Sequence, residues 1–144
     1  MSDLDPSFKE KIRQSFARQS VMKLIGAELT LVDAGVIEIT LPYRSELTQQ
    51  HGYVHAGIIT TIADSACGYA AYTLMPAGAE VLSVEFKINL LRPAKGEMFL
   101  ARADVIKPGR ALTVVRADVF TLLAQGTREL IATMQATIMC LRKE

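Results

Sequence analysis

The stretch from residue 57 to residue 79 contains a single charged side chain, Asp64. Its apolar and small residues recur at helical spacing, and they are Ile58, Ile59, Ile62, Ala63, Ala66, Cys67, Ala70, Ala71 and Leu74. A helix that is apolar on most of its surface must be largely buried, so the rest of the chain has to cover it. Pro76 and Gly78 end the pattern, and we predict a central helix over residues 56–75.

Segments of alternating apolar and polar side chains can supply that cover. Residues 82–90 alternate with the period of a half-buried strand. Three later segments continue in the same way and are separated by short turns, which imply antiparallel hairpins: residues 98–107, 112–123 and 130–141. Residues 25–41 form a further predicted hairpin with its turn at 33–35. We therefore predict an α+β fold in which an antiparallel sheet wraps the central helix.

The N-terminal part of the chain carries a helix signal. Asp5-Pro6 is typical of a helix start, and the apolar residues that follow are Phe8, Ile12, Phe16, Val21 and Leu24. We predict one amphipathic helix within residues 1–24. No linker, repeat or low-complexity segment is visible, so we expect a single domain over residues 1–144, a length sufficient to bury a core.

Charge and cysteine content exclude several classes of function. With 16 basic and 15 acidic side chains, the chain offers no general electrostatic reason to bind nucleic acid. We see neither a signal peptide nor the roughly 20 apolar residues of a membrane helix, and expect a cytoplasmic protein without a membrane partner. Cys67 and Cys140 lack the paired spacing of zinc or redox motifs, so we expect two buried thiols and no metal site.

Asp64 is the first candidate for chemistry, because a buried acid needs a partner or a wet cleft. It lies on a narrow polar stripe of the helix, which could also simply face solvent: Thr60, Thr61, Asp64, Ser65, Gly68 and Tyr72. The helix start near Ala56 offers free N–H groups and the positive end of the helix dipole, which can stabilise an oxyanion. A carboxylate and such a donor are what hydrolysis of an activated acyl group requires.

The spacing of these two groups has a consequence for assembly. Asp64 lies eight residues beyond Ala56, which is about 12 Å along a helix axis. One chain cannot easily bring both groups to the same carbonyl. Two antiparallel copies of the helix would set the start of one against the middle of the other, so the chemistry implies an isologous homodimer with two composite sites.

The segment Gln49-Gln50-His51-Gly52-Tyr53-Val54-His55-Ala56-Gly57, followed by Ala63-Asp64, resembles the hotdog-fold thioesterases of the phenylacetate-pathway (PaaI-like) type. The likeness continues through residues 82–85, 91–94 and 109–110. It implies a hotdog fold, hydrolysis of acyl-CoA without a cofactor, and a homodimer with shared active sites. Relatives often pair such dimers, so a homotetramer is also expected.

The resemblance also implies roles for individual residues. Asp64 becomes the nucleophile or general base, and Ala56 takes the place of a glycine whose N–H binds the oxyanion. Gln49 corresponds to an Asn or Gln that positions water or the carbonyl, and Ser83 to a Ser or Thr that orients water. His55 is expected to bond to backbone at the helix entry.

Basic residues form a second expected group around the substrate. Lys107 and Arg110 flank a glycine turn and, as in relatives, could reach the phosphates of coenzyme A, or they could be solvated hairpin charges. Arg92 has the same two interpretations. His55 and Gly57 at the helix entry are also included among the expected substrate-binding residues.

Two other functions remain open at this stage. A hotdog hydratase or dehydratase would use His55 as a base with Asp64 about an enoyl thioester, although residues 49–64 follow the thioesterase pattern. The other is a non-catalytic module that binds acyl thioesters. The sequence does not choose among aryl-acetyl, short and medium acyl groups.

Overall fold

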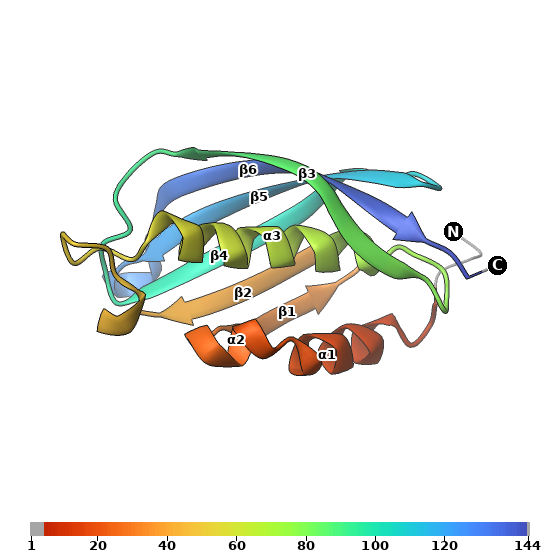
Figure 1. The fold of residues 1–144 in the computed structure, drawn as a ribbon, viewed down its shortest axis with the longest axis horizontal. Helices are drawn as coiled ribbons and strands as arrows, with labels where there is room; N and C mark the ends of the chain where they lie inside the picture. Colours follow the sequence, from red (N-terminus) through yellow and green to blue (C-terminus); the bar gives the residue numbers. More distant parts are fainter. Residues whose placement is uncertain (1–4, 144) are drawn as a thin grey trace.

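A computed structural model describes residues 5–143 and shows a six-stranded sheet that curves around one long helix (Figure 1). All strand pairs are antiparallel, in the order β1-β2-β4-β5-β6-β3. The strands are β1 (Glu28–Asp33), β2 (Val36–Pro42), β3 (Glu80–Leu90), β4 (Met98–Lys107), β5 (Leu112–Leu122) and β6 (Arg128–Leu141). The predicted α+β architecture is confirmed.

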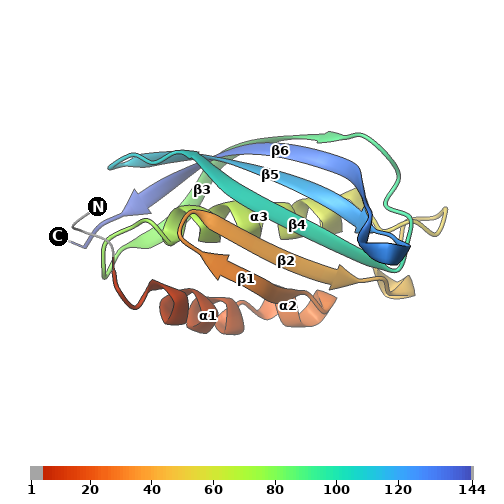
Figure 2. The same cartoon turned by 180° about the vertical axis from the view of Figure 1, so that it is seen from behind.

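The central helix α3 (Ala56–Tyr72) lies against the concave face of the sheet (Figures 1 and 2). Its small residues, such as Ala63 and Ala66, are fully buried and let the helix pack close to the strands, beside Ile59 and Ile62. The prediction placed its end at residue 75. Regular helix stops three residues earlier, and the chain continues in single turns up to Met75.

The N-terminal helix differs from the prediction. Within the described part of residues 1–24 there are two helices, α1 (Phe8–Arg18) and α2 (Ser20–Ile25), separated by an extended Gln19. In one straight helix, Met22 would point about 80° away from Ile12. The break at Gln19 lets both of them reach the core, and it leaves Leu24, which the prediction assigned to the apolar face, 75% exposed.

The two edges of the sheet are different. Helices α1 and α2 run beside the β1 edge, whereas β3 forms the opposite edge and, among the described residues, pairs only with β6 (Figures 1 and 2). Along this edge Leu82, Val84 and Phe86 are 54, 48 and 44% exposed. An open strand edge that carries apolar side chains is a surface on which another strand can pair.

A β-bulge in β3 changes which side chains face the helix. Simple alternation groups Ser83 with the polar, outward-facing residues of the strand. The register shifts between Ser83 and Glu85, so Ser83 faces α3 before the bulge, and Ile88 packs on the core after it. The bulge therefore turns a serine toward the polar stripe of the central helix.

Two further expectations concern single features. No helix in residues 5–143 has the length and apolar character needed to cross a bilayer. Cys67 is buried as predicted, and burial raises the pKa of its thiol. Cys140 is only half-buried, because it lies near the end of β6.

Candidate active site

Asp64 lies in the middle of α3 and faces a pocket of about 540 Å³ between α1, α3 and the start of β3. Its Oδ1 accepts a hydrogen bond of 2.7 Å from the Ser83 hydroxyl. No group of residues 5–143 donates to Oδ2. The acid is therefore held by one oxygen and free at the other, inside a cleft that water can enter.

The start of α3 is capped by His55. Its Nδ1 accepts a hydrogen bond of 2.8 Å from the Gly57 N–H, so this nitrogen carries no proton in the structure. A Cβ at position 57 would lie 3.0 Å from that nitrogen, which explains the glycine. The expected backbone bond of His55 is confirmed, and Gly57 belongs to the cap.

One N–H of this first turn is left without a protein partner. The N–H groups of Ile58 and Ile59 donate to the His55 carbonyl, and that of Gly57 to its ring. Across the described residues, no acceptor lies within hydrogen-bond range of the Ala56 N–H. Ala56 also does not have a positive φ, so an alanine is accommodated without strain at the position where the resemblance implies a glycine.

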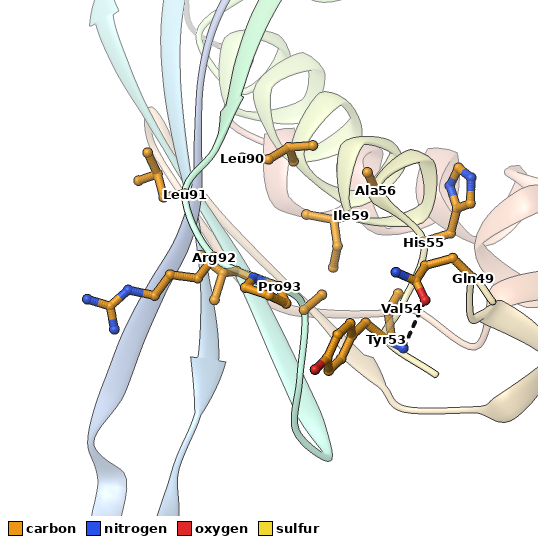
Figure 3. Close-up of a pocket in the computed structure, with 12 residues that line it drawn as sticks. Gln49, Tyr53, Val54, His55, Ala56, Ile59, Leu90, Leu91, Arg92 and Pro93 are labelled. Carbon is orange, nitrogen blue, oxygen red and sulfur yellow. Dashed lines mark hydrogen bonds between the residues drawn. The ribbon is translucent and has the colours of Figure 1, made fainter. Parts of the chain in front are cut away.

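A second cavity, of about 480 Å³, opens at this helix start (Figure 3). Its walls are mostly apolar and include Val54, Ile59 and Leu90. The Gln49 Oε1 accepts hydrogen bonds from the backbone N–H groups of His51 and Tyr53. Since these bonds occupy the oxygen, the amide nitrogen is the end of Gln49 that faces the cavity, as Figure 3 shows.

The basic candidates lie away from these groups. Arg92 lines the second cavity, but its guanidinium points away from it and lies 3.5 Å from Glu129 (Figure 3). Lys107 and Arg110 are exposed on the β4–β5 turn, at the end of the sheet opposite the start of α3 (Figure 1). A single protomer therefore does not bring Lys107 or Arg110 to Ala56.

Ala56 and Asp64 open onto different cavities of the same protomer. They are eight residues apart on one helix, or about 12 Å along its axis. No group of three or more His, Cys, Asp or Glu side chains within residues 5–143 could hold a metal ion. The chain thus presents an acid site and an N–H donor site as two separate halves.

Helix α1 contributes to the Asp64 pocket, which no pattern in the sequence had indicated. Ser15, Arg18 and Gln19 line it, together with Tyr69 and Tyr72 of α3. Burial raises the pKa of both tyrosines. The spacing of Ser15 and Arg18 places both on one face of α1, but only the tertiary packing shows that this face, and Gln19 after it, meet the Asp64 pocket.

Comparisons with known proteins identify thioesterases as relatives of this chain. The family model described as Thioesterase superfamily matches residues 51–122. The crystal structure of a thioesterase family protein from Silicibacter pomeroyi is 51% identical, covers 94% of this chain and 99% of that one, and superimposes with a TM-score of 0.91. A Halobacterium salinarum protein named as a candidate esterase is 28% identical over 127 residues, which are 84% of this chain and 83% of that protein.

More distant matches are found both among solved structures and among sequences. The PaaI protein of the phenylacetic acid degradation operon of E. coli has a TM-score of 0.83 at 19% identity, over 98% of this chain and 96% of that one. A Listeria monocytogenes protein named 1,4-dihydroxy-2-naphthoyl-CoA hydrolase is 23% identical over 123 residues, 85% of this chain and 97% of that protein. The predicted hotdog fold is confirmed.

Proposed function

Because this chain belongs to the thioesterase superfamily, we propose that it hydrolyses acyl-CoA thioesters to a free acid and coenzyme A. The observation that carries the proposal is a pair of unsatisfied groups, the Asp64 Oδ2 in its pocket and the Ala56 N–H at the helix start. The name of the Listeria relative supports a CoA thioester as the substrate class. CoA thioesters form inside cells, and a cytoplasmic location is part of the proposal.

The chemistry follows from the free oxygen of Asp64. As a general base, Oδ2 takes a proton from water while the water oxygen attacks the thioester carbonyl. The tetrahedral oxyanion accepts a hydrogen bond from the Ala56 N–H, and its collapse breaks the C–S bond. The departing sulfur takes the proton that Asp64 holds, so coenzyme A leaves as the thiol and the carboxylate is regenerated. As a nucleophile, Oδ2 attacks the carbonyl itself and expels the thiolate, and water then hydrolyses the anhydride.

Ser83 and Gln49 act as positioning groups in this proposal. The Ser83 hydroxyl holds Oδ1 and thereby aims Oδ2 into the pocket. Gln49 presents its NH₂ group to the same cavity as the Ala56 N–H. We therefore assign Gln49 to the thioester carbonyl oxygen and not to the attacking water.

The two halves of the site meet in a homodimer. Antiparallel pairing of β3 with β3 of a second copy would cover Leu82, Val84 and Phe86 and continue the sheet. The same two-fold symmetry sets the start of α3 from one protomer beside Asp64 of the other. Two predictions remain open. One is a tetramer built from two such dimers, and the other is contact of the coenzyme A phosphates with Lys107, Arg110 or Arg92.

A thiol-release assay over acyl-CoA esters of different chain length and aryl character tests the function. The wild-type protein should release free thiol, and Asp64→Asn should lose nearly all activity, because an amide is a poor base and nucleophile. More than a few per cent of residual activity, with deamidation excluded, would remove Asp64 from the mechanism.

A crotonyl thioester separates the remaining functions. Hydration would keep the thioester intact, whereas hydrolysis releases the thiol. Binding of acyl-CoA without either product would identify a non-catalytic module. The bond from the Gly57 N–H to His55 Nδ1 argues against His55 as the base of a hydratase, because that nitrogen already serves the helix cap.

A further inference from the structure

Helix α1 forms one wall of the pocket that contains Asp64. Ser15 and Arg18 are three residues apart on the helix and share one of its faces, and both line that pocket together with Gln19, the extended residue that follows α1. Ser15 Oγ lies 3.2 Å from the Tyr69 hydroxyl, and Gln19 Nε2 donates to the Ser65 hydroxyl at 3.3 Å. Hydrogen bonds on either side therefore anchor the part of α1 that carries Arg18.

Arg18 has no acid partner in the structure. Within residues 5–143, no carboxylate oxygen lies within 4.0 Å of its guanidinium, whereas Arg92, Arg102 and Arg116 each have such a partner. Its charge is near enough to Tyr69 and Tyr72 to oppose the rise in their pKa that burial causes. Arg18, an exposed residue of the pocket wall, thus carries a positive charge that is paired with no carboxylate of residues 5–143.

The space between Asp64 and this charge is open. Gly68 lies one turn beyond Asp64 and lines the same pocket, and a Cβ at position 68 would meet nothing within 4 Å. Tyr69 and Tyr72 lie five and eight residues beyond Asp64, roughly 8 to 12 Å along the helix. A substrate bound at Asp64 can therefore extend along α3 toward Arg18.

We propose that Arg18 binds a negatively charged group of the thioester substrate, an inference that rests on the proposed function. Asp64 and Glu80 both line this pocket and would repel an anion, so one guanidinium is the group that can make anion binding favourable there. A CoA thioester has two sources of such a group: the phosphates of coenzyme A, and a carboxylate at the far end of a dicarboxylic acyl group.

The test compares Arg18→Gln with Arg13→Gln, a matched loss of charge on an exposed residue of the same helix. Substrates are monocarboxylic and dicarboxylic acyl groups, each as the CoA and as the N-acetylcysteamine thioester, which lacks phosphate. Arg18→Gln should raise KM about 10- to 100-fold for substrates that carry the recognised anion, the effect of losing a charged hydrogen bond, with little change in kcat. Arg18→Lys should recover most of this loss, and Arg13→Gln should match the wild type.

The pattern of the loss identifies the source of the anion. A raised KM for all CoA esters, but for no N-acetylcysteamine ester, assigns Arg18 to phosphate. A raised KM for dicarboxylic acyl groups on both carriers assigns it to the far end of the acyl group. Equal KM values for Arg18→Gln and Arg13→Gln on every substrate would overturn the inference, as would a loss of kcat and Tm without a change in KM.

A binding measurement separates this inference from the proposed function. Calorimetric titration of wild type and Arg18→Gln with free coenzyme A and with adipate does not depend on turnover. Weaker binding of one of these anions to Arg18→Gln supports the anion site even if no thiol is released, a result that would reject the thioesterase proposal alone. If the wild type is active and Arg18→Gln binds both anions as tightly as the wild type does, the anion site alone is rejected.

Discussion

Ala56→Pro would remove one N–H group from the proposed site and little else. Position 56 is the first residue of α3, where proline is tolerated because its fixed φ suits the helix. The preceding His55 has φ −59° and ψ 138°, the extended conformation that a residue before proline favours. Since no group of residues 5–143 accepts a hydrogen bond from the Ala56 N–H, the substitution breaks no hydrogen bond among them. We expect normal folding and a loss of about 10²- to 10³-fold in kcat, or roughly 3–4 kcal/mol.

This variant also tests whether the site is shared between protomers. Asp64→Ala chains keep the N–H donor, and Ala56→Pro chains keep the acid. In a mixed dimer one site would receive both intact groups and the other neither. Random exchange of equal amounts makes half of all dimers mixed, so the mixture should recover about one quarter of the wild-type activity, although both parents are nearly inactive.

The assay is thiol release before and after subunit exchange, with exchange followed by native mass spectrometry. Ala56→Gly, which keeps the N–H, is the matched control and should stay active. Absence of any recovery despite demonstrated exchange would refute the shared site, and so would a fully active monomer in sedimentation. A folded Ala56→Pro variant with wild-type kcat would refute the oxyanion donor.

Further predictions concern the positioning groups, the dimer edge and the start of α1. Ser83→Ala and Gln49→Ala should each lower kcat/KM by about 10- to 100-fold, which is less than the effect of Asp64→Ala, because each variant loses one hydrogen bond to a charged or partly charged oxygen. Losses as large as that of Asp64→Ala would contradict a positioning role. Phe86→Glu should yield an inactive monomer in sedimentation, because it places a charge on the proposed β3 pairing edge, and an active dimer would reject that edge. The Asp5 carboxylate accepts bonds from Ser7, which hold its pKa below the ordinary value of 3.8, so its stabilisation is complete above about pH 4 and is lost as the pH falls through the lowered pKa. The difference in unfolding free energy between wild type and Asp5→Asn should disappear in that acidic range, and a difference that grows on acidification would contradict this assignment.

Local periodicity was sufficient to predict most elements of the fold. The uncharged stretch around Asp64 specified a buried helix, because apolar residues at helical spacing have only a covered position available. Alternation predicted β4 with the bounds that the structure has, and β5 within one residue. The candidate pair of Asp64 and Ala56 also came from the sequence, since a lone acid and a helix start are both local features.

Other properties depend on contacts between distant segments, and no local pattern encodes them. The pairing of β3 with β6 exposes an apolar edge, and a bulge in that pairing turns Ser83 toward Asp64. The break at Gln19 follows from the need to bury both Ile12 and Met22, and it sets the position of Arg18 in the Asp64 pocket. The orientation of Gln49 is decided by two backbone N–H groups of its own loop. The sequence by itself determined which groups could react, and the tertiary structure decided what surrounds them, because side-chain direction depends on strand register and helix breaks that long-range packing selects.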